Sequence, residues 1–111
     1  LWSALDLARR EGDLPGQGVI LSNVGQAYLD LGQPALAASH LQASLRLIRQ
    51  TDNRPVECAA LRVLGDAYRA AGDVDLAESC YRQAIHLAET LDDTRREAKV
   101  RHALRSLRNG E

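Results

Sequence analysis

The sequence predicts an all-α fold, an α-α superhelix in which antiparallel helix pairs stack side by side and a last helix caps the stack. Three observations predict it: the chain repeats itself after a shift of 40 residues, apolar residues within each copy follow helical spacing, and glycine and proline recur at matching positions. Such a period indicates units that bury their apolar faces against their neighbours. The recurring residues are Gly25, Ala27, Tyr28, Gly32, Leu36, Ala37, Ser39 and Leu47, with counterparts Gly65, Ala67, Tyr68, Gly72, Leu76, Ala77, Ser79 and Leu87.

The first helix of each unit is predicted over residues 16–31 and 55–71. Pro15 and Pro55 occupy aligned positions, and proline suits the first position of a helix because its ring fixes φ and no amide hydrogen is needed there. Gly32 and Gly72 mark the ends, since a residue without a Cβ can adopt the left-handed conformation that closes a helix.

The second helix of each unit is predicted over residues 34–50 and 74–91. Only one residue separates Gly32 from Pro34, and the copy at Gly72 has the same spacing. A turn this short makes the two helices antiparallel. Polar clusters at 51–53 and 91–93 predict the loops between units.

Two further helices are predicted at the ends of the chain. Residues 1–11 align with the second helix of the repeat, so this segment is the remainder of a unit whose first helix is missing. Thr94 and Glu97 have the spacing of a capping box, which predicts a helix over 95–109. The single domain 1–111 therefore divides into a truncated unit (1–13), two repeats (14–53 and 54–93) and a capping helix (94–111).

One face of this last helix changes character. Arg101, Arg105 and Arg108 stand where the preceding unit has leucine, glycine and tyrosine, whereas the opposite face keeps apolar residues. A charged outer face is what a terminal helix requires, so we expect the array to end here. The alternative is a basic nucleic-acid surface, although the helix carries no aromatic residue for base stacking. It would consist of Arg95, Arg96, Lys99, Arg101, Arg105 and Arg108.

Composition argues against several classes of partner and chemistry. The net charge of −1 gives no global attraction to nucleic acid or to an anionic membrane, and no apolar run approaches the roughly 20 residues that span a bilayer. The histidines His40, His86 and His102 lack the spacing of metal ligands or of a catalytic base with its nucleophile. We expect no enzymatic activity, no cofactor and no metal.

The cysteines bear on the compartment in which the protein is expected, and the first residue bears on whether the chain is part of a longer one. Cys58 and Cys80 fit neither a disulfide framework nor a zinc motif, so we expect buried free thiols in a cytoplasmic protein. The chain begins at Leu1 without a methionine, from which we expect a piece of something longer.

Two segments carry a resemblance to the tetratricopeptide repeat (TPR). They are Val24-Gly25-Gln26-Ala27-Tyr28 followed by Ala37, Leu41 and Ser44, and Leu64-Gly65-Asp66-Ala67-Tyr68 followed by Ala77, Tyr81 and Ala84. The period is 40 residues here against about 34 in the common repeat. Longer units of this kind are similar to those of bacterial signalling and transcriptional regulators.

The resemblance implies a non-catalytic scaffold for protein–protein interaction, the C-terminal TPR segment of a larger bacterial signalling or transcriptional regulator. The alternative is a module that senses a peptide or small ligand and controls a separate effector domain. The partner in either case is a protein or peptide, with no direct nucleic-acid or membrane contact. A homodimer through the exposed N-terminal helix is a further expectation, because Leu1, Trp2 and Leu5 lack a covering helix.

In arrays of this family the first helices line the concave surface, so their polar residues are the candidate partner contacts. The middle unit also permits a purely structural interpretation of equal weight, because Arg62–Asp66 and Asp66–Arg69 have the spacing of helical ion pairs. The candidate contacts are Asn23, Gln26, Asp30, Arg62, Asp66, Arg69, Lys99 and His102.

Overall fold

The computed structural model describes residues 9, 12 and 14–110, and the side chains from residue 16 onward within the first long helix. Its helices are α2 (Leu14–Asp30), α3 (Pro34–Ile48), α4 (Arg54–Ala70), α5 (Val74–Thr90) and α6 (Thr94–Arg108). Each lies within two residues of its predicted bounds. The predicted helix at 1–11, and with it the proposed dimer contact at Trp2, falls almost wholly outside the described residues.

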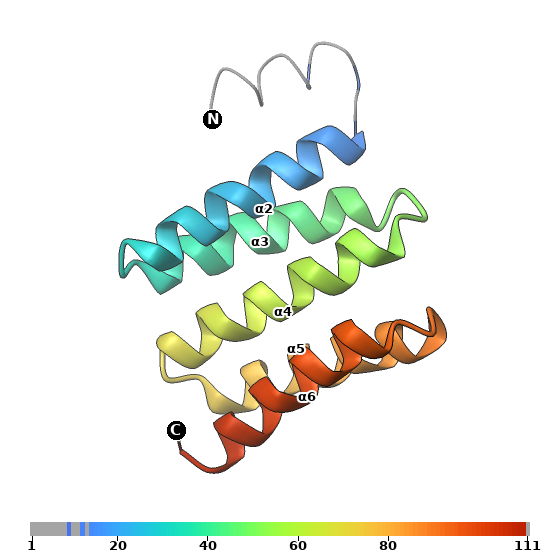
Figure 1. The fold of residues 1–111 in the computed structure, drawn as a ribbon. Helices are drawn as coiled ribbons and strands as arrows, with labels where there is room; N and C mark the ends of the chain where they lie inside the picture. Colours follow the sequence, from blue (N-terminus) through green and yellow to red (C-terminus); the bar gives the residue numbers. More distant parts are fainter. Residues whose placement is uncertain (1–8, 10–11, 13, 111) are drawn as a thin grey trace.

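The helices form a stack of antiparallel pairs (Figure 1). α2 packs on α3 and α4 packs on α5 within the pairs, while α3 against α4 and α5 against α6 join one unit to the next. No strand occurs in the described part of the chain. The predicted all-α architecture of paired helices is therefore confirmed.

The turns within each pair use glycine as predicted. Gly32 has φ +75° and Gly72 has φ +83°, and the amide of the residue after each glycine donates to a tyrosine carbonyl near the helix end, at 2.9 Å in both copies. Asp92 adopts φ +53° between α5 and α6 and ends α5 in the same way. Aspartate is one of the few residues with a side chain that adopts this conformation readily.

The predicted capping box at Thr94 and Glu97 is wrong. The cap of α6 is Asp93, whose Oδ1 accepts from the Arg96 amide at 3.0 Å, and the Glu97 carboxylate instead accepts from Arg101 Nε at 2.8 Å. Asn53 and Asp73 cap α4 and α5 in the same manner. α5 begins at Val74 as predicted, whereas α4 and α6 begin one residue earlier than predicted. In each case an Asn or Asp side chain immediately before the helix already satisfies a free amide.

Glycines allow the two helices of each pair to approach closely. A Cβ built on Gly25 would lie 2.6 Å from Leu41 Cγ, and one built on Gly65 would lie 2.6 Å from Tyr81 Cε1. Leu41 and Tyr81 are fully buried, so each large side chain fills the space that its partner glycine leaves. The core thus consists of equivalent contacts repeated along the stack.

A second contact of this kind differs between the units. In the first unit, Gly18 leaves room for the buried Ile48, since a Cβ at Gly18 would lie 2.6 Å from Ile48 Cγ1. The matching positions of the second unit hold Cys58 and Ala88, both buried. Small and large residues have exchanged places, which keeps the total volume similar.

The two cysteines are buried free thiols, as predicted. Burial raises the pKa of both thiols, for Cys80 to about 11. Cys58 Sγ donates to the Ala84 carbonyl at 3.3 Å. At neutral pH both side chains therefore act as small neutral core residues.

Candidate functional site

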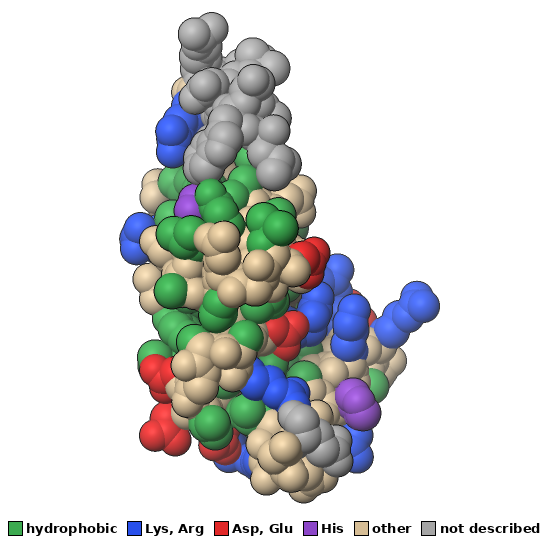
Figure 2. All heavy atoms as spheres, turned by 90° about the vertical axis from the view of Figure 1, so that its left-hand side faces the viewer, with side chains coloured by type: hydrophobic (Ala, Val, Ile, Leu, Met, Phe, Trp, Pro, Cys, Tyr) green, Lys and Arg blue, Asp and Glu red, His purple; other side chains and the backbone are tan. Residues whose placement is uncertain are grey.

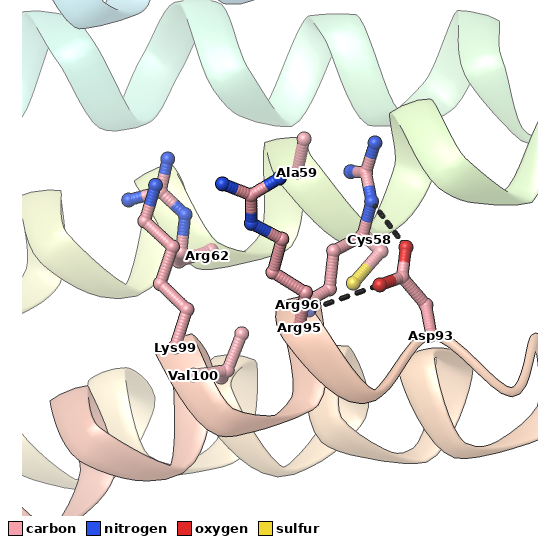
Figure 3. A pocket seen from close by; sticks show the side chains of 8 residues that line it. All are labelled: Cys58, Ala59, Arg62, Asp93, Arg95, Arg96, Lys99 and Val100. Atoms are coloured by element: carbon pink, nitrogen blue, oxygen red, sulfur yellow. Dashed lines mark hydrogen bonds and ion pairs between the residues drawn. The ribbon is translucent and has the colours of Figure 1, made fainter.

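A hollow of about 530 Å³ lies between α4 and α6 (Figure 3). It exists because α4 and α6 make few direct contacts, whereas α5 packs against both. Its lining combines small or apolar side chains with four cations and one carboxylate. The lining residues are Cys58, Ala59, Arg62, Asp93, Arg95, Arg96, Lys99 and Val100.

The cations around this cleft differ in how they are paired. Arg62 Nη1 lies 3.3 Å from Asp66 Oδ2, and Arg96 Nε lies 2.9 Å from Asp93 Oδ2. Among the described residues, Arg95 and Lys99 have no hydrogen-bond or ion-pair partner. Both are exposed, so two positive charges at the cleft remain available to a partner.

A second cleft, of about 200 Å³, lies next to the first, between α2 and α4. Its lining contains Ala59 and Arg96, which also line the first cleft, and Arg96 Nη1 donates to the Pro55 carbonyl at 3.0 Å at this boundary. We call these two adjacent clefts together the groove. The remaining lining residues of the second cleft are Val19, Ser22, Asn23, Pro55 and Val56.

The two clefts differ in charge. Arg96 is the only charged residue among those lining the second cleft, whereas four cations line the first. Figure 2 shows Lys and Arg side chains gathered on the right-hand side of the molecule, where the surface is hollowed, with acidic side chains next to them. The groove is thus cationic at the α6 end and nearly neutral at the α2 end.

Some of the predicted contact residues line the two clefts and others do not. Arg62 and Lys99 line the first cleft and Asn23 lines the second. Gln26 donates to Asp30 at 2.9 Å within α2. His102 is exposed on α6 and does not line either cleft.

The polar residues of the middle unit are largely engaged within the protein. The Asp66 carboxylate accepts from the Tyr81 hydroxyl as well as from Arg62. Arg69 does not pair with Asp66, as the helical spacing predicted, but donates to Ser106 Oγ at 3.0 Å. Burial and the neighbouring Asp66 carboxylate raise the pKa of Tyr81. Asp66 and Arg69 therefore help to hold α4, α5 and α6 together.

Arg95, Arg96, Ala59 and Val19 are groove residues that the predicted contact set omits. The spacing of Arg95 and Lys99, one helical turn apart, is the signal that could have identified them as one face of the helix. Ala59 and Val19 carry no such signal, because a small or apolar residue in a helix is normally interpreted as part of the core.

The outer face of α6 is exposed, as the capping interpretation requires. Arg101, Arg105 and Arg108 are all exposed, while Val100, Leu104 and Leu107 are buried on the opposite face. Arg101 lies 2.8 Å from Glu97 and 3.4 Å from Glu89, and Arg108 lies 3.2 Å from Glu78. Hydrogen bonds from Arg82 and Arg108 lower the pKa of Glu78.

These ion pairs argue against the alternative of a basic nucleic-acid surface. Three of its six cations, Arg96, Arg101 and Arg108, already face carboxylates. Such pairing reduces the net field that would attract a phosphate backbone.

Two other classes of site were also sought. No group of three or more His, Cys, Asp or Glu residues within the described segments is arranged to hold a metal ion. In the same part of the chain, no helix combines the length and the apolar character needed to cross a membrane.

Comparison with known proteins identifies a family and a relative. The tetratricopeptide repeat family matches residues 16–90. The TPR repeat-containing protein PA0015 of Pseudomonas aeruginosa is 34% identical over 84 residues, which cover 76% of this chain and 74% of that protein. Repeats of this family generally form non-catalytic, protein-binding modules. The helical pairs, the glycine contacts and both matches together show that the chain belongs to the tetratricopeptide repeat family.

Proposed function

We propose that this chain is a non-catalytic scaffold that binds a protein partner in the groove. The observation that carries the proposal is that two neighbouring clefts, which share Ala59 and Arg96 in their linings, extend across α2, α4 and α6. Two clefts in a row across three helices suit an extended segment of another protein, which can contact several units at once.

We also propose the wider setting predicted from the sequence, with residues 94–111 as a capping helix. The exposed arginines of α6 support the cap, because a further helix packed on that face would have to bury Arg101 and Arg108. In this setting the segment closes the C-terminal end of the array in a bacterial signalling or transcriptional regulator, in the cytoplasm.

A substitution that fills the groove tests the scaffold. Ala59 lines both clefts and is only partly buried, so Ala59→Trp places a large side chain in the groove without disturbing the core. Ala35→Trp is the matched control, because Ala35 is exposed at the start of α3 and lines neither cleft. Circular dichroism checks that both variants keep the helical content of the natural chain.

The readout is quantitative mass spectrometry of proteins captured from a lysate of the source organism. We expect partners that bind the natural chain and Ala35→Trp to be depleted with Ala59→Trp. An identical set of partners with all three proteins would show that binding does not use the groove.

The predicted alternative, a ligand-sensing module, also has one supporting observation. A cleft of about 530 Å³ falls within the range of small-molecule sites, about 300–1,000 Å³. A sensor changes the activity of its effector domain when the cleft is filled, whereas a scaffold only recruits a partner. Measuring effector activity of the longer protein with Ala59→Trp therefore separates the two functions.

A further inference from the structure

We infer that a cleft on the other side of α4 from the groove binds a small carboxylic acid with an apolar body. This cleft, which we call the outer cleft, has a volume of about 310 Å³ and is lined by residues of α3, α4 and α5. Leu61 and Leu64 of α4 line it, whereas Cys58 and Ala59 of the same helix line the first cleft. The outer cleft shares no lining residue with the groove, so the inference goes beyond the proposed function.

Leucines from all three helices provide the apolar part of the lining. Leu45, Leu61 and Leu64 are core residues that also line the outer cleft, and Leu76 of α5 lines it while 45% exposed. The buried thiol of Cys80 lies beside them. An apolar ligand body placed here would remove the exposed surface of Leu76 from water, which is favourable.

The charged part of the lining consists of two arginines and no carboxylate. Arg49 is engaged within the protein, because its Nε lies 3.2 Å from Glu57 Oε2 and its Nη2 donates to Gln83 Oε1 at 3.4 Å. The side chain of Arg46 has no hydrogen-bond or ion-pair partner among the described residues. A carboxylate would pair with Arg46 without breaking an internal ion pair.

Two hydroxyl groups in the same lining also favour an acceptor. The Tyr68 hydroxyl accepts a hydrogen bond from Gln42 Nε2, and Ser79 Oγ accepts one from Gln83 Nε2 at 3.2 Å. Each hydroxyl therefore keeps its own hydrogen for a further acceptor. A carboxylate offers only acceptors, whereas an ammonium group offers only donors and would be repelled by the arginines.

Two hydrogen bonds between helices limit the length of the ligand. Gln42 bonds to Tyr68 of α4, Arg49 bonds to Gln83 of α5, and all four residues line the outer cleft. Gln42 and Arg49 are seven residues apart on α3, which is about 10 Å along the helix axis, and Arg46 lies between them. A partner helix, roughly 10 Å across, would have to break both bonds to lie along the cleft. This spacing suits a small molecule better.

An NMR titration of the full chain tests the inference. The probe is 2-naphthoate, and its binding is followed by the chemical shifts of the backbone amides. Three compounds serve as controls: 2-naphthamide keeps the apolar body without the charge, acetate keeps the carboxylate without the body, and 2-naphthylmethylamine reverses the charge. We expect 2-naphthoate to shift the amides of Ser79 and Gln83 and to bind about three- to tenfold more tightly than each control.

Two pairs of variants locate the site. Arg46→Gln should weaken 2-naphthoate binding about three- to tenfold and leave 2-naphthamide binding unchanged, whereas Arg54→Gln removes an exposed arginine that lines none of the three clefts. Ser79→Trp fills the outer cleft and should abolish binding. Its control is Ser39→Trp, because Ser39 is the exposed repeat counterpart of Ser79 and lines none of these clefts.

The inference is overturned if 2-naphthamide or acetate binds as tightly as 2-naphthoate, if both variants of a pair bind alike, or if no compound binds. Shifts confined to residues of the groove overturn it as well. Ala59→Trp should bind 2-naphthoate like the natural chain, since Ala59 does not line the outer cleft. Loss of partner capture with Ala59→Trp therefore reports on the groove alone, and loss of 2-naphthoate binding with Ser79→Trp reports on the outer cleft alone.

Discussion

Replacing Ala88 by isoleucine tests whether the two units pack equivalently. Ile48, the counterpart of Ala88, fits in the first unit only because Gly18 has no side chain. A Cβ added to Gly18 would lie 2.6 Å from Ile48 Cγ1. In the second unit Cys58 occupies the position of Gly18, and both Cys58 and Ala88 are buried. An isoleucine at position 88 therefore has no space for its branched side chain.

The expected cost follows from the packing. Overfilling a closely packed core destabilises a protein by about 1–3 kcal/mol. With an unfolding entropy of about 2.1 cal/mol/K per residue, a chain of this size loses roughly 4 °C of melting temperature per kcal/mol. Ala88→Ile should thus lower the melting temperature by about 4–13 °C.

A double variant distinguishes overfilling from other effects. Cys58→Gly alone should also destabilise, because it places a flexible residue in a helix and leaves a small cavity. In Cys58→Gly with Ala88→Ile, the isoleucine fills that cavity as Ile48 does beside Gly18. We expect the double variant to be more stable than the sum of the single changes predicts, by about 1–2 kcal/mol.

Thermal and urea unfolding, followed by circular dichroism, provide the measurement. Ala70→Ile is the control, because Ala70 is exposed in α4 and a change there should stay within about 0.5 kcal/mol. Effects of the two single variants that add within about 0.5 kcal/mol would refute the equivalence of the two contacts.

Two further predictions concern the helix cap and the buried thiol. Asp93→Ala should lower the free energy of unfolding by about 0.5–2 kcal/mol, since the Asp93 side chain caps α6. Thr94→Ala should change it little. Equal losses for the two variants in urea unfolding would contradict the assignment of the cap. Burial raises the pKa of Cys80 from 9.0 to about 11. Below pH 9 the thiol is neutral in both states, and the folded chain keeps its full stability. As the pH rises from 9 through 11 the thiol ionises first in the unfolded chain, and this lowers the free energy of unfolding. Cys80→Ala should therefore show a shallower fall in melting temperature over this range than the natural chain, and parallel curves for the two proteins would contradict the shifted pKa.

Local signals account for the accuracy with which the helices could be predicted. Gly32 and Gly72 end their helices because of a backbone conformation that residues nearby in the sequence determine. The cap of α6 was displaced by one residue because two competing local patterns, Thr94 with Glu97 and Asp93 alone, both start a helix. The recurrence of Asn53, Asp73 and Asp93 at intervals of 20 residues was the available signal for the second pattern.

The candidate site was less predictable from the same residues. Helical spacing permitted Arg69 to pair with Asp66, but the structure places Ser106 of α6 within reach of Arg69 and the Tyr81 hydroxyl within reach of Asp66. The choice depends on where neighbouring helices lie. Ala59 and Val19 became candidate contacts only once the clefts that they line were located.

The sequence by itself determined the number of described helices, their order, their turns and the faces that they bury. These features depend on interactions among residues less than about two helical turns apart, or on a pattern that repeats along the chain. Only the tertiary structure decided that α4 and α6 are separated by a cleft, and which cations at that cleft have partners. A cleft is the space that packing leaves between helices, and it depends on the summed volumes and directions of many side chains.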